Sequence, residues 1–171
     1  GDGNIGKTQF LIAYTNQCLG APLASVFDNY TGELNFEGND YQLQIFDTAG
    51  QEDYKKLRPL TYQETDVFIL CFSLISYVSM ENIENTWCPE IKEHCPNTPY
   101  ILVGLQSDLR DNYDPEKHET YDEIVTKEKG NEMKMKIGAT YYIECSVDKK
   151  INLKVTFELA IKASMEPMPK P

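Results

Sequence analysis

The chain opens with the run Gly1-Asp2-Gly3-Asn4-Ile5-Gly6-Lys7-Thr8, which matches the complete phosphate-binding pattern G-x-x-x-x-G-K-[ST]. Its glycines let the backbone curl so that successive N–H groups point inward at a phosphate. Lys7 can reach the outer phosphates of a nucleotide, and the Thr8 hydroxyl can ligate Mg²⁺. A helix that starts here adds the positive end of its dipole. The whole run is therefore predicted to bind a nucleotide and its metal.

Composition places the chain among single-domain globular proteins. Its 171 residues, 41% of them hydrophobic and 25% charged, are enough for one domain with a sizeable core. No apolar run approaches the ~20 residues of a membrane span, and neither a signal nor a transit peptide is recognisable. The net charge of −11 argues against nucleic acid or an anionic membrane as a direct partner. Five cysteines without zinc spacing predict reduced thiols in a cytoplasmic protein.

Strand-like and helix-like runs alternate along the chain, which predicts an α/β layered fold. Residues 34–36 and 41–46 alternate in polarity around a Gly38 turn and predict a hairpin. Apolar runs over 67–74 and 100–105 predict strands that are covered on both faces. The remaining predicted elements are helices over 6–16, 80–94 and 155–163 and a strand over 140–145.

The segment 112–136 differs from the rest because it is almost entirely polar and charged. Pro115 stands where a helix would begin, and the segment continues into a charged helical stretch through Lys136. A solvated surface helix is one interpretation, and an excursion that docks a partner is the other.

Three further motifs indicate which nucleotide is bound and how it reacts. Each motif follows a predicted strand, and doubly wound sheets bind ligands at the ends of their strands. In the run 47–51, Asp47 can hold the Mg²⁺ shell, Gly50 can offer its N–H to a γ-phosphate, and Gln51 can orient an attacking water. Beside Gln106, the carboxylate of Asp108 can accept two hydrogen bonds from a guanine edge, a donor pair that adenine lacks. In the run 144–147, which includes Ser146, the N–H of Val147 can meet a guanine carbonyl.

The order of these motifs is that of small GTPases, and nearly the whole chain resembles the Rho family, of the Rac and cell-division-control type. The polar segment after Arg110 falls where that family carries its extra insert. The resemblance rests on the phosphate loop, on residues 47–54, and on the runs Val26-Phe27-Asp28-Asn29-Tyr30, Leu57-Arg58-Pro59-Leu60, Thr65-Asp66-Val67-Phe68, His94-Cys95-Pro96-Asn97-Thr98-Pro99 and Leu109-Arg110-Asp111.

The resemblance implies a P-loop NTPase fold, in which a small G domain has a mixed sheet flanked by helices. It implies a domain over 1–165 with the insert at about 112–129 and a short tail over 166–171. The implied function is a monomeric, GTP-hydrolysing switch that binds GTP, GDP and Mg²⁺ and signals to the actin cytoskeleton.

The same resemblance assigns the contacts with other proteins. Effectors, exchange factors and GTPase-activating proteins would bind the two switches, which run from Leu23 to Tyr30 and from Gly50 to Arg58. Within the first switch, Phe27 and Tyr30 would be effector contacts. We expect a cytoplasmic protein, peripheral at a membrane only if a lipidated C-terminus is missing from this sequence.

Departures from the family pattern keep a second interpretation open. Ser25 stands in place of the threonine that ligates Mg²⁺ and keeps its hydroxyl, whereas Leu105 replaces a polar residue that ties the base loop to the phosphate loop. Gln106 in place of lysine also occurs in the cell-division-control branch, and Val147 in place of alanine leaves its backbone contact available. The alternative is a non-enzymatic module that keeps the switch surface but binds nucleotide weakly.

A phosphate loop normally follows a buried strand at the centre of the sheet, and no strand residues precede Gly1. About six apolar residues at ~1.5–3 kcal/mol each are of the order of 10 kcal/mol, which rivals the stability of a whole domain. We therefore expect a sheet that lacks its first central strand, in a sequence truncated at both ends.

Overall fold

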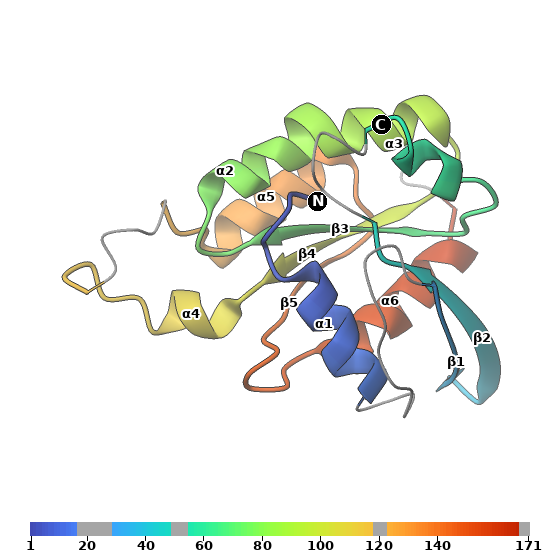
Figure 1. Ribbon diagram of the computed structural model, residues 1–171, viewed down its shortest axis with the longest axis horizontal. Helices are drawn as coiled ribbons and strands as arrows, with labels where there is room; N and C mark the ends of the chain where they lie inside the picture. Colours follow the sequence, from blue (N-terminus) through green and yellow to red (C-terminus); the bar gives the residue numbers. More distant parts are fainter. Residues whose placement is uncertain (17–28, 49–54, 118–122, 168–171) are drawn as a thin grey trace.

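The computed structural model describes residues 1–16, 29–48, 55–117 and 123–167, and within them it shows an α/β domain (Figure 1). The helices α1 and α6 lie on one side of a parallel sheet, and α2, α3 and α5 lie on the other. No helix in the described part combines the length and apolarity that crossing a bilayer requires. The elements follow the order α1 (Lys7–Tyr14), β1 (Asn29–Phe36), β2 (Asn39–Phe46), β3 (Phe68–Ser73), α2 (Tyr77–Asn82), α3 (Cys88–His94), β4 (Tyr100–Leu105), α4 (Ser107–Asp111), α5 (Lys127–Ile137), β5 (Tyr142–Glu144) and α6 (Leu153–Met165).

The parallel sheet has the order β3-β4-β5 and forms the centre of the domain. Every residue of β4 is buried, as its unbroken apolar run predicts for a strand covered on both faces. One side of the sheet packs against α1 and α6, where the Tyr14 and Phe157 rings stack with centroids 3.8 Å apart. The predicted strands over 67–74 and 100–105 are therefore confirmed, and the one over 140–145 is shorter than predicted.

The predicted hairpin is present and its first strand is longer than predicted, because β1 begins at Asn29. The strands β1 and β2 are antiparallel, and Phe36 pairs with Asn39 across the turn. The turn residues Glu37 and Gly38 have φ angles of 50° and 80°. Two consecutive positive φ angles are typical of the type I′ turn that favours tight hairpins, and glycine at the second position suits it.

The hairpin and the parallel sheet are separate, with a cavity of about 800 Å³ between β2 and β3. Apolar side chains of both strands line it, Leu43 and Ile45 from β2 and Ile69 from β3. Helix α6 contributes Phe157 to its wall. Within the described residues, the predicted mixed sheet is thus divided in two.

The helical segment predicted over 80–94 begins earlier and is not uniform. It starts at Tyr77, where the Ser76 hydroxyl accepts a hydrogen bond from the Ser79 N–H at 3.3 Å. A π-helical turn, Ile83–Trp87, separates α2 from α3. Pro89 has no N–H to donate, so the regular hydrogen-bond ladder cannot pass through the start of α3 unchanged.

The polar segment before α5 differs in part from the prediction. Residues 115–117 form a turn, so the helix predicted to begin at Pro115 is not found in the described residues 112–117. The charged helix through Lys136 is confirmed as α5, which Thr126 caps and Gly138 ends with a φ of 77°. Residues 118–122 of the predicted insert lie outside the described residues.

Replacing Gly130 with alanine should destabilise the protein, although alanine normally favours a helix by about 1 kcal/mol over glycine. A Cβ on Gly130 would lie 2.1 Å from the Tyr142 hydroxyl oxygen, so the ring must move. We expect a net loss of about 2 kcal/mol, since overpacking a well-filled site costs about 1–3 kcal/mol. Urea unfolding measures this loss, and Glu132→Ala on the exposed side of the same helix is the control. A Gly130→Ala protein as stable as that control would contradict the packing argument.

Candidate functional site

The phosphate loop lies between β3 and the start of α1. The side chain of Lys7 folds back onto the carbonyl groups of this loop. The Lys7 ammonium donates to the Gly1 carbonyl at 2.9 Å and to the Asp2 carbonyl. Gly6, in the left-handed region at a φ of 95°, leads directly into α1. Burial lowers the pKa of Lys7 below its ordinary value. A partly buried ammonium whose partners are carbonyl oxygens suits an anionic ligand such as a phosphate.

Not every residue of the loop presents its side chain to this site. Ile5 is buried in the core, and Asn4 is exposed. The Asp2 carboxylate accepts hydrogen bonds from the Asn82 amide and the Trp87 indole, each at 2.7 Å. The side chains of Ile5 and Asp2 are therefore engaged within the protein, which leaves their main chain for the predicted nucleotide contacts. These contacts of Asp2 could not be predicted from local sequence, because Asn82 and Trp87 lie 80 and 85 residues away.

Thr8 and Asp47 place two oxygen ligands beside the loop. The Thr8 hydroxyl donates to Asp47 Oδ2 at 2.7 Å, and Asp47, one residue after β2, is 9% exposed. Hydroxyl and carboxylate oxygens are the donors that Mg²⁺ prefers, so this pair fits the metal that the loop implies. The other predicted residues of this centre, Ser25, Gly50 and Gln51, lie outside the described residues.

The predicted base-reading residues lie together at the carboxyl ends of β4 and β5. The Ser146 hydroxyl donates to Asp108 Oδ1 at 2.7 Å, and Ser146 is fully buried. The Ser107 N–H donates to the Cys145 carbonyl at 3.0 Å, which joins the two loops through the main chain. Val147 follows Ser146 directly, so its backbone N–H belongs to the same loop.

Gln106 connects the base loop to the phosphate loop. Its φ is 66°, and its Nε2 lies 3.7 Å from the position that a Cβ on Gly6 would occupy. Its Oε1 accepts a hydrogen bond from the Ser73 hydroxyl at the end of β3. Leu105 is buried in the core, so its apolar side chain is accommodated without a polar partner. Sequence reasoning missed Ser73, because only the pairing of β3 with β4 brings it near Gln106.

Two residues of the predicted partner surface are not available for contact. Tyr30 is 7% exposed and packs in the core. Arg58 is 1% exposed, since its guanidinium forms two hydrogen bonds of 3.1 and 3.0 Å with Glu90 and lies over the Trp87 ring. The prediction of Tyr30 as an effector contact is therefore wrong for its side chain, and the Arg58 side chain, at the end of the second switch, is buried instead of facing a partner or solvent. The rest of both segments, residues 23–28 and 50–54, lies outside the described residues.

Arg58→Met should cost about 3–5 kcal/mol, because it leaves the Glu90 carboxylate buried without its cation. Burial by itself raises the pKa of Glu90, but hydrogen bonds from Arg58 and Tyr62 outweigh it and hold that pKa below its ordinary 4.5. The stabilisation from the pair is thus present above that value and is lost as the pH falls through the lowered pKa. Urea unfolding at neutral and acid pH measures both effects.

The control for this prediction is Lys117→Met, which breaks an exposed pair with Asp114 at 3.3 Å. A surface pair contributes only about 0–1 kcal/mol. If Arg58→Met cost no more than this control, the buried pair would not stabilise the fold.

The fold and the site together are those of a nucleotide-binding α/β domain, with Asp108, the carboxylate predicted to read the base, just after the carboxyl end of β4. The family model of the Ras family matches residues 1–166, and the chain therefore belongs to the Ras family of small GTPases. Members of this family are GTP-binding switches that bind GTP, GDP and Mg²⁺. The α/β content, the helices and the parallel sheet are those of a Ras-family small G domain.

Proposed function

We propose that this chain is a Rho-type switch that binds GTP or GDP with Mg²⁺, hydrolyses GTP to GDP and signals to the actin cytoskeleton. One observation carries the nucleotide part of the proposal. Lys7 lies over the phosphate loop, Thr8 at the start of α1 contacts Asp47, and the base loop, which leads to the Asp108–Ser146 pair, brings Gln106 Nε2 to 3.7 Å from the position of a Cβ on Gly6. The Rho part is supported by the sequence motifs and by the position of the polar segment after Arg110.

Each residue has a defined task in this proposal. The loop amides and Lys7 bind the phosphates, and Asp108 accepts hydrogen bonds from the guanine edge. Thr8, Asp47 and Ser25 would hold Mg²⁺, which neutralises charge on the outer phosphates when it is bound. Gln51 orients the water that attacks the γ-phosphate in line, and an activating protein supplies an arginine.

The partners follow from the same proposal. Effectors, exchange factors and activating proteins would bind the segments from Leu23 to Tyr30 and from Gly50 to Arg58, through side chains other than Tyr30 and Arg58. The protein would act as a monomer in the cytoplasm, which suits the free thiols of Cys71, Cys88, Cys95 and Cys145.

The second candidate is a non-enzymatic interaction module with weak nucleotide binding. It is favoured by Leu105, whose apolar side chain is buried in the core and offers no polar group to join the base loop to the phosphate loop. The two candidates differ in affinity and in turnover, so one set of measurements separates them.

The test is isothermal titration of the protein with GDP, GTP and ADP in the presence of Mg²⁺, followed by phosphate release from GTP. We expect binding of both guanine nucleotides, no comparable heat with ADP, and slow hydrolysis. Binding of GDP at micromolar or weaker affinity without phosphate release would favour the interaction module. Equal binding of ADP and GDP would overturn guanine recognition by Asp108.

A further inference from the structure

We propose that Arg110 and Glu144 are positioning residues for guanine recognition, because their ion pair fixes the two segments that carry Asp108 and Ser146. This inference rests on the proposed guanine binding and adds two residues to it. Arg110 lies two residues after Asp108, and Glu144 lies two residues before Ser146. The two segments are thus joined at two points, by the Asp108–Ser146 hydrogen bond and by the Arg110–Glu144 ion pair.

The contact between the two side chains is bidentate. Arg110 Nη1 donates to Glu144 Oε1 and Nη2 donates to Oε2, both at 2.7 Å. Each side chain is 14% exposed, so water screens the pair much less than it screens a surface pair. A planar guanidinium bound through two parallel bonds restrains rotation as well as distance. The pair therefore restrains α4 relative to β5 in orientation.

Helix α4 needs this support because it has only 5 residues and begins directly after the base loop. A helix this short cannot hold its own position by internal hydrogen bonds. Arg110 also donates to the Val125 carbonyl at 3.1 Å, which joins α4 to the chain just before α5. Asp108, in the first turn of α4, is thereby restrained from the far end of its own helix.

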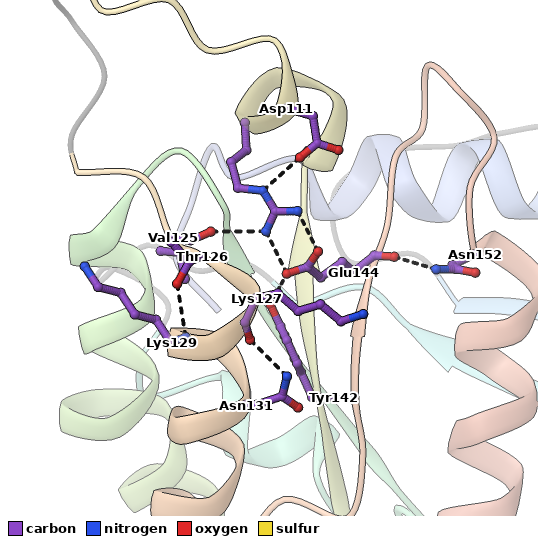
Figure 2. A network of polar contacts seen from close by, with 10 residues as sticks. Asp111, Val125, Thr126, Lys127, Lys129, Asn131, Tyr142, Glu144 and Asn152 are labelled. Atoms are coloured by element: carbon purple, nitrogen blue, oxygen red, sulfur yellow. Dashed lines mark hydrogen bonds and ion pairs between the residues drawn. The ribbon is translucent and has the colours of Figure 1, made fainter.

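Glu144 is held in turn by its neighbours, as Figure 2 shows. The Tyr142 hydroxyl donates to Glu144 Oε1 at 2.7 Å, and the Asn152 amide donates to the Glu144 carbonyl at 2.8 Å. The absence of a side chain at Gly130 leaves the space that the Tyr142 ring needs beside α5. The hydrogen bonds from Arg110 to Glu144 are also the main reason that the pKa of Arg110 is raised. Glu144 is thus a fixed anchor for Arg110.

The expected consequence concerns the choice of base. Asp108 selects guanine by accepting hydrogen bonds from both the ring N–H and the exocyclic amino group, and inosine lacks that amino group. If the Asp108 carboxylate is no longer held in orientation, we expect the hydrogen bond from the exocyclic amino group to be lost first. A general weakening of the fold would instead lower the affinity for both nucleotides alike.

The experiment compares the affinities for GDP and inosine diphosphate in the 171-residue protein, in Arg110→Lys and in Glu144→Gln. Both substitutions preserve most of the side-chain volume while removing the bidentate charged contact. We expect each to lower the preference for GDP over inosine diphosphate about tenfold, mainly through GDP. The control is Glu84→Gln. It removes the carboxylate charge from the 2.7 Å ion pair that joins Glu84, in the π-helical turn, to Lys136 in α5. It should leave the preference unchanged.

If the unsubstituted protein prefers GDP and both variants keep that preference unchanged, the positioning role is overturned. The proposed function would still stand in that case. An equal loss of both nucleotides would assign the pair a purely structural role and overturn the inference as well. If the unsubstituted protein does not prefer GDP, guanine recognition itself fails, and this inference fails with it.

Discussion

Fusing about six alternating valine and leucine residues ahead of Gly1 should stabilise the protein by an amount of the order of 10 kcal/mol. The cavity between β2 and β3 is about 800 Å³ and is bordered by an apolar face of each strand. Within the described residues, the facing edges of β2 and β3 have no strand partner. An inserted strand would bury its side chains there and pair with both edges. Thermal unfolding measures the gain, which should raise the Tm by about 20 °C or more.

The matched control is an extension of equal length that contains proline at alternate positions. Proline cannot donate to the neighbouring strands, so it is not accommodated in the middle of a sheet. The proline extension should not give the large gain in Tm. An apolar extension that gives no more stability than the proline one would mean that the cavity does not accept a strand.

Gln51→Leu should leave nucleotide binding intact and remove partner-stimulated GTP hydrolysis. In switches of this kind the activating partner raises turnover by about 10⁵ from an intrinsic rate of the order of 10⁻⁴ s⁻¹, and most of that factor should be lost. Leucine has nearly the volume of glutamine but has no amide to orient the attacking water. Binding depends instead on Lys7, the Thr8–Asp47 pair and Asp108, which the substitution leaves in place.

Single-turnover phosphate release, with and without an activating protein, measures this effect, and titration with GDP measures binding. Gln63→Leu is the control, because Gln63 is exposed and lines a hollow with His94 and Pro96 that no phosphate-loop residue borders. An equal loss of binding and of stimulated hydrolysis in Gln51→Leu would contradict the role given to Gln51. Stimulation that survives the substitution would contradict it too.

The elements that the sequence predicted best are those whose signal is local. The strand β4 is one unbroken apolar run, and its observed bounds are the predicted ones. The hairpin was predicted because the Gly38 turn separates two alternating runs. The helix before His94 was predicted with the wrong start, because the Ser76 cap was not recognised and Pro89 interrupts the regular hydrogen bonds.

The residues of the candidate site also divide into those with a local signal in the sequence and those without one. Phosphate loop, Asp47, Asp108 and Ser146 were predicted from short motifs, and the structure brings Asp108 and Ser146 into direct contact. Arg58 was predicted to end the second switch, a segment that partners bind, since a charged residue gives no local sign of burial. Its burial depends on Glu90, which lies 32 residues away in a different helix.

The amino-acid sequence alone determined the phosphate loop, the α/β class and the residues that can read a base, because each is encoded by neighbouring residues with a fixed geometry. Only the tertiary structure decided which side chains support that site: Glu144 for Arg110 and Trp87 for Asp2. These partners are 34 and 85 residues apart, and parallel pairing of β3, β4 and β5 brings distant segments to one end of the sheet. Such contacts follow from the packing of the chain, and the spacing of residues along it carries no signal for them.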